Sequence, residues 1–129
     1  MYEKHNFSIT NTTKGKPVSL PFKRMKNEIL GKKYILSLVF IGDKRSATLN
    51  KKYRKKSGSA NILSFPLSKE EGEIFINSRH AQRDVSHFNV PHKRFIGHLF
   101  IHGLLHLKGS AHGSKMNHTE QLMHRKFGL

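Results

Sequence analysis

Three histidines in the second half of the chain have spacings that suit a metal site. They lie in the segment HGLLHLKGSAH at 102–112, where His102 and His106 are four residues apart and His112 follows six residues later. Residues four apart share one face of a helix, so two imidazoles can hold one ion. Gly109 predicts the end of that helix, and the resulting turn would bring His112 to the same ion. Three nitrogens leave the fourth position of tetrahedral zinc open, as in catalytic sites.

The same segment lacks the general base of the zinc proteases. Those enzymes carry HExxHxxGxxH, and every histidine and the glycine match here, but Gly103 stands at the position of the glutamate. The alternative is that a chain with ten histidines produces this spacing by chance. We favour a metal site, because an apolar helix that buried two imidazoles without partners would be costly.

The other histidines have weaker arguments. His98 continues the row, but each step of four residues drifts about 40° around a helix, so we expect it to be a neighbour of the site and not a ligand. The remaining six are expected at the surface: His5, His80, His87, His92, His118 and His124. Cysteine is absent, which excludes a disulfide scaffold and leaves His, Asp and Glu as metal ligands.

The charge of the chain indicates a polyanionic partner. There are 24 Lys and Arg against 8 Asp and Glu among 129 residues, a formal net charge of +16, which favours nucleic acid. The length suits one domain over 1–129. The longest apolar run, YILSLVFI at 34–41, is too short to span a bilayer, and the first 17 residues lack the apolar core of a secretory signal. We therefore expect a cytoplasmic protein with no membrane partner.

The apolar pattern predicts short strands and several helices. Strands are expected at 7–10, 34–41, 61–66 and 73–77, with 34–41 at the centre of the sheet. Helices are expected from Pro21 to Leu30, from Asp43 as N-cap to Arg54, from Pro91 to about Gly109, and around Met116, Met123 and Phe127. The third of these helices is apolar on nearly every side and should run through the core.

Four segments together resemble the YbeY family of bacterial metal-dependent endoribonucleases of rRNA maturation. HLFIHGLLHLKGSAH at 98–112 is similar to the family signature, and LNKKYRKK at 49–56, NILSFP at 61–66 and GEIFIN at 72–77 match other family segments in the same order. The resemblance implies an α+β fold, with a small mixed β-sheet of about four strands packed against helices and a buried central metal-binding helix. It also implies one zinc ion held by His102, His106 and His112.

The same resemblance assigns a role in RNA binding or cleavage to Arg54. That residue stands in a basic run with Lys51, Lys52, Lys55 and Lys56. The planar fork of arginine suits a phosphate, whereas we expect the lysines to attract the RNA backbone diffusely.

This sequence departs from the family pattern at two positions. Ala111 replaces the aspartate that precedes the third histidine, so a carboxylate that could orient a ligand or move a proton is missing. Glu73 replaces the aspartate of the family's GDI segment. It is the candidate for a carboxylate that orients a metal ligand or acts as the general base.

These features lead to a hypothesis of zinc-dependent cleavage of single-stranded RNA, with rRNA and the ribosome as expected partners. Zinc and Arg54 would stabilise the transition state, and zinc-bound water or the ribose 2′-hydroxyl would be the nucleophile. The first alternative is a non-catalytic RNA- or ribosome-binding protein with a structural metal. The second is a zinc protease, which Gly103 disfavours.

Overall fold

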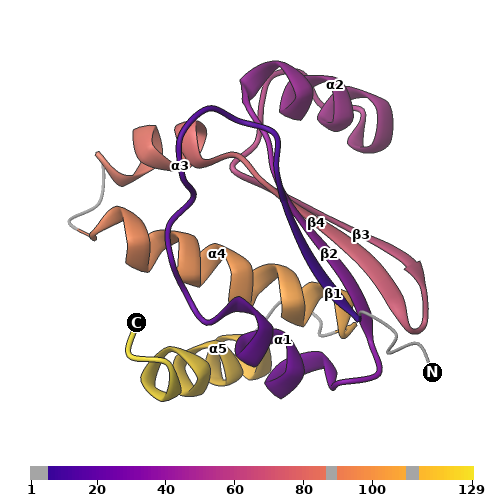
Figure 1. Ribbon diagram of the computed structural model, residues 1–129, viewed down its shortest axis with the longest axis vertical. Helices are drawn as coiled ribbons and strands as arrows, with labels where there is room; N and C mark the ends of the chain where they lie inside the picture. The colour runs from indigo at the N-terminus through magenta and orange to yellow at the C-terminus, as the bar shows by residue number, and fades with distance from the viewer. Residues whose placement is uncertain (1–5, 87–89, 110–113) are drawn as a thin grey trace.

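The computed structural model describes residues 6–86, 90–109 and 114–129, and shows an α+β fold, as predicted (Figure 1). Its elements in chain order are β1 (Phe7–Asn11), α1 (Phe22–Leu30), β2 (Ile35–Phe40), α2 (Asp43–Arg54), β3 (Ile62–Ser68), β4 (Glu71–Ile76), α3 (Ser78–Val85), α4 (His92–Leu107) and α5 (Ser114–Lys126). Within the described ranges, no helix combines the length and the apolar composition that a membrane crossing requires.

The four strands form one mixed sheet with the order β1-β2-β4-β3. β1 and β4 both pair parallel to β2, while β3 pairs antiparallel to β4. β2 therefore lies inside the sheet, as its continuous apolar run predicted. Leu36, Leu38 and Phe40 face one hydrophobic cluster, and Val39 belongs to the cluster on the other side.

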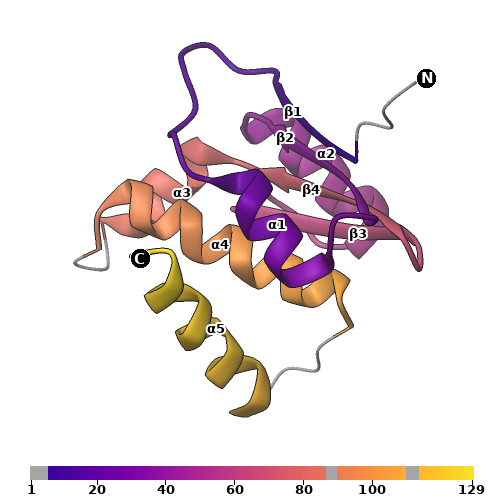
Figure 2. The same ribbon diagram turned by 60° about the horizontal axis from the view of Figure 1, so that its bottom comes forward.

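Helices cover both faces of this sheet. α2 covers one face, where Leu49 packs against Leu63 and Phe75. α1 and α4 cover the other face, and α5 packs on α4 from outside, so that α4 lies between the sheet and α5 (Figure 2). This arrangement makes α4 the central helix of the fold.

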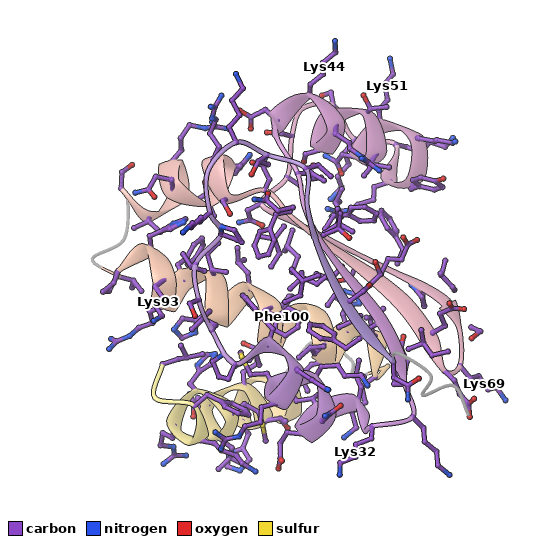
Figure 3. All side chains as sticks on the ribbon, in the orientation of Figure 1. Lys32, Lys44, Lys51, Lys69, Lys93 and Phe100 are labelled. Atoms are coloured by element: carbon purple, nitrogen blue, oxygen red, sulfur yellow. The ribbon has the colours of Figure 1, made fainter. Side chains whose placement is uncertain are left out.

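The sequence of α4 explains its central position. Ile96, Phe100, Ile101 and Leu104 are fully buried, and Phe100 lies in the interior while labelled lysines extend outward around the molecule (Figure 3). Gly109 follows the helix with a φ of +90°, a conformation that glycine adopts without strain. The predicted end of the helix is confirmed.

A glycine allows α4 to approach β3 closely. A β-carbon on Gly103 would lie 2.8 Å from Ser64 Oγ, 2.9 Å from Ile62 Cδ1 and 3.2 Å from Ile74 Cδ1. No side chain fits there without a shift of the sheet or its side chains. The position at which zinc proteases carry their glutamate is thus filled by the packing of α4 on the sheet.

Two sequence expectations about helices were wrong or incomplete. Asp43 is the first residue of α2 and not its N-cap, which is Gly42. Its carboxylate instead accepts hydrogen bonds from Arg83 and Asn77, and so ties α2 to α3 and to the end of β4. The apolar pattern does not predict α3, because Ala81 is its one buried residue.

We predict that Gly103→Ala lowers the free energy of unfolding by about 1–3 kcal/mol, because the added methyl group overpacks the contact with β3. Helix propensity alone would favour alanine by about 1 kcal/mol, so a net loss must come from the close contacts. Chemical denaturation measures the change. Gln82→Ala, an exposed change inside α3, is the control, and equal stability of Gly103→Ala and wild type would contradict the packing argument.

Candidate active site

A cleft of about 790 Å³ lies between α4 and β3 and extends to the end of α2. Five parts of the chain contribute to it: the end of α2, the segment from 60 to 65, α3, α4 and α5. Its polar and aromatic lining includes Tyr53, Arg54, Asn61, Ser64, His80, His98, His102, His106 and Glu120. The cleft therefore brings Arg54 together with two of the three predicted metal ligands.

His102 and His106 lie one turn apart on the same side of α4, with ring centroids separated by 6.0 Å. The predicted third ligand, His112, lies outside the described residues, as does Ala111. Among the residues that are described, no group of three or more ligand-type side chains is placed to hold a metal. Two imidazoles at the edge of a cleft nevertheless fit one zinc ion as two of its ligands.

A carboxylate from α5 supports the first of these histidines. Glu120 Oε1 lies 2.8 Å from His102 Nδ1, which donates a hydrogen bond to it when the ring is neutral. That bond leaves Nε2 of His102 with a lone pair that can bind a metal, an arrangement found at many zinc sites. Glu120 thus gives this site a carboxylate, although Ala111 replaces the family aspartate.

The sequence analysis missed Glu120, because spacing along the chain does not say that α5 packs on α4. One signal could have drawn attention to it. Glu120 is the only acidic residue in the sequence after Asp84, so it stands alone in a strongly basic segment.

A second pair of histidines connects α4 to α5 beside the cleft. His98 Nδ1 lies 2.7 Å from His124 Nε2, and the ring centroids are 3.7 Å apart. Burial, followed by the charge of the neighbouring His98, lowers the pKa of His124 to about 4, although Glu120 acts in the opposite direction. Burial, followed by the charge of Arg94, also lowers the pKa of His98. Both rings are therefore neutral at pH 7, and one donates a hydrogen bond to the other.

The expectation that the other histidines lie at the surface was only partly right. His118 is exposed, whereas His124, His92 and His80 are half-buried. His80 also lines the cleft. His5 and His87 lie outside the described residues.

The end of α2 presents an arginine and an aromatic ring to the cleft. Lys55 ends the helix in the left-handed conformation, with a φ of 57°. Tyr53 is 57% exposed, and its ring centroid lies 5.2 Å from that of Phe65 on β3. Arg54 lines the cleft beside it.

The four lysines around Arg54 are exposed but do not line this cleft. Lys51, Lys55 and Lys56 border a second hollow of about 590 Å³ on α2, and Lys52 Nζ lies 5.3 Å from the Tyr53 ring centroid. Lys51 extends outward from α2 (Figure 3). This placement suits general attraction of a polyanion more than contact with a reacting phosphate.

Glu73 lies on the other side of the sheet from α4. Its neighbours on β4 approach that helix, since Gly72 lies next to Leu107 and Ile74 next to Gly103. Side chains alternate along a strand, so Glu73 faces the side covered by α2. The cleft is lined without it, and its supporting or catalytic role stays a prediction.

Comparison with a solved structure agrees with this architecture. The solution structure of a protein from Thermotoga maritima superposes with a TM-score of 0.69 at 22% sequence identity, covering 95% of this chain and 89% of that one. The shared feature at this level of identity is the fold.

Comparison of sequences identifies the family. A family model described as "YbeY: Endoribonuclease YbeY" matches residues 3–127, and the chain therefore belongs to the YbeY family. It is 38% identical over 85 residues to the endoribonuclease YbeY of Ehrlichia canis, covering 62% of this chain and 55% of the relative. It is 34% identical over 85 residues to that of Thermodesulfovibrio yellowstonii, covering 60% and 54%. These matches span about half the length of the two relatives.

We predict that Glu120→Gln weakens zinc binding by about 10- to 100-fold, because the amide orients His102 less strongly and does not raise its basicity. Competition with a chromophoric chelator measures the affinity without any activity assay. The matched control is Glu28→Gln, which removes an equal charge from a pair with Lys126 of α5, away from the cleft. Equal zinc affinity in Glu120→Gln and wild type would contradict the role of Glu120 in supporting zinc binding by His102.

Proposed function

We propose that this protein is a zinc-dependent endoribonuclease that cleaves single-stranded RNA. We further propose that it acts in rRNA maturation and ribosome quality control. It would act in the cytoplasm, with the ribosome or its small subunit as partner. The observation that carries the proposal is the shared cleft of Arg54, His102 and His106. The names of the relatives support it, since each is called an endoribonuclease.

The residues that would hold zinc are His102, His106 and His112. Glu120 fits this assignment, because its bond to Nδ1 of His102 directs the other ring nitrogen to a metal. When bound, zinc supplies positive charge that polarises a phosphoryl oxygen and makes a water molecule more acidic.

Arg54 favours a phosphodiester over a peptide as the substrate. Its guanidinium can donate two parallel hydrogen bonds to phosphate oxygens, whose negative charge increases in the transition state. A peptide has no such charge, and Gly103 leaves no room for the glutamate with which zinc proteases activate water. The exposed lysines of α2 would attract the RNA from a distance.

Tyr53 favours a single strand over a duplex. Bases of single-stranded RNA are free to stack on an exposed aromatic ring, whereas bases in a helix are already stacked on each other. The exposed ring is adjacent in sequence to the arginine that would hold the phosphate, so a base and its phosphate can be bound together.

We predict that Arg54→Ala lowers kcat/KM for cleavage of a labelled single-stranded RNA by about 100- to 1,000-fold, because a donor to the transition-state charge is lost. Arg54→Lys should recover only part of the activity, since an ammonium lacks the planar fork. Arg45→Ala, an exposed change on the same helix, is the control.

The same assay separates the proposal from its alternative. Wild-type protein that binds RNA in a salt-dependent way but leaves it intact would favour a binding protein with a structural metal. Cleavage that withstands both chelation and Arg54→Ala would contradict the proposed mechanism.

We predict that Tyr53→Ala lowers affinity for single-stranded RNA by about 1–3 kcal/mol, roughly 5- to 150-fold, because one stacked base is lost. Tyr53→Phe keeps the ring and should bind like wild type. Fluorescence anisotropy with a labelled oligonucleotide measures both variants, and duplex RNA of the same length should not distinguish them. If Tyr53→Ala binds single-stranded RNA with the affinity of wild type, Tyr53 does not stack on a base.

A further inference from the structure

His80 lies in the same cleft as the predicted metal ligands but belongs to a different helix. It is the third residue of α3, and its backbone N–H donates to Asn77 Oδ1 at 3.1 Å, the N-cap bond of that helix. Its side chain is 26% exposed and lines the cleft with Arg54 and His102. The ring therefore reaches the cleft from an element other than α2 and α4.

One nitrogen of this ring is held in a chain of hydrogen bonds. His80 Nδ1 lies 2.7 Å from Ser59 Oγ. Hydrogen bonds from Arg83 and Asn77 hold the pKa of the Asp43 carboxyl well below its usual range, so Asp43 is an ionised carboxylate close to Ser59. A hydroxyl near a carboxylate turns its hydrogen toward the negative charge, and in that orientation the Ser59 oxygen accepts a hydrogen bond from Nδ1–H of His80.

With Nδ1 bonded to Ser59, Nε2 is the ring nitrogen of His80 that is left to donate to a substrate. Its nearest partner among the described residues is Asp84 Oδ2 at 3.5 Å, which is longer than a hydrogen bond. Asp84 is itself held by Asn61, whose Nδ2 donates to the same oxygen at 2.9 Å. Nε2 therefore has a fixed carboxylate at ion-pair distance and no closer partner in the described part of the chain.

The proposed reaction needs such a group. Cleavage of a phosphodiester requires that the leaving oxygen gain a proton, and the sequence supplies no carboxylate at Gly103 or Ala111. Glu120 is engaged with His102, and His98 with His124.

We propose that His80 is the general acid of this site, an inference that rests on the proposed function. The attacking oxygen, from water or the ribose 2′-hydroxyl, forms a bond to phosphorus and loses its proton to solvent. The bond from phosphorus to the leaving oxygen breaks, and that oxygen takes the proton from Nε2 of the His80 imidazolium. Neutral His80 then regains a proton from solvent.

The charged and titratable groups that share the cleft with His80 or lie next to it come from four helices: Asp84 and Arg83 on α3, Asp43, Tyr53 and Arg54 on α2, His98, His102 and His106 on α4, and Glu120 on α5. Because Arg83 forms a bidentate pair with Asp43, Asp84 is the carboxylate that acts on Nε2 directly.

The test compares two RNA substrates of the same sequence, one of which carries sulfur in place of the leaving oxygen. A thiolate leaves without protonation, so it makes a general acid unnecessary. We expect His80→Gln to lower kcat on ordinary RNA by about 100-fold or more, and to cleave the sulfur substrate at nearly the wild-type rate. Zinc affinity and RNA affinity should not change. His118→Gln, an exposed histidine of α5, is the control.

Equal losses on both substrates, or no loss on ordinary RNA, would overturn the role of His80. Wild-type protein that cleaves neither substrate would instead refute the proposed function, and the inference with it. If His80→Gln does not fold, His80→Asn provides the readout. It should show the same contrast between the two substrates, and equal losses on both would overturn the assignment.

Discussion

The packing of α4 against β3 at Gly103 is the contact on which the site depends. Because no β-carbon separates the helix from Ser64 and Ile62, α4 approaches the sheet closely, and its apolar residues fill the core. His102 and His106 are then fixed at the edge of the cleft by the same helix. The glycine thus sets the geometry of the imidazoles and also excludes the glutamate of zinc proteases.

The sequence predicted the features that short segments determine by themselves. The apolar run of β2, the fully apolar α4 and the glycines after α1 and α4 all led to correct elements. The features it missed depend on contacts between distant segments. Glu120 meets His102 because α5 packs on α4, and His80 lines the cleft from α3, where it is bonded to Ser59 and Asn77. The periodicity of apolar residues along the sequence does not predict contacts between distant segments.

Charge has two separate roles in this molecule. Most of the lysines are exposed and extend from all sides of the fold, which suits attraction of RNA over a distance (Figure 3). A few charged side chains are instead held by partners, as Asp43 is by Arg83 and as Glu120 is by His102. The exposed charge would serve the proposed binding of RNA, whereas the paired groups hold side chains in and beside the cleft.

The support of His102 by α5 also bears on how the protein is made. Ribosomes synthesise a chain from its N-terminus, so the sheet and α4 leave the ribosome before Glu120 does. A growing chain therefore carries the two imidazoles of α4 for a time without the carboxylate that orients one of them. The support of His102 by Glu120 is therefore complete only after α5 has been synthesised and has packed on α4.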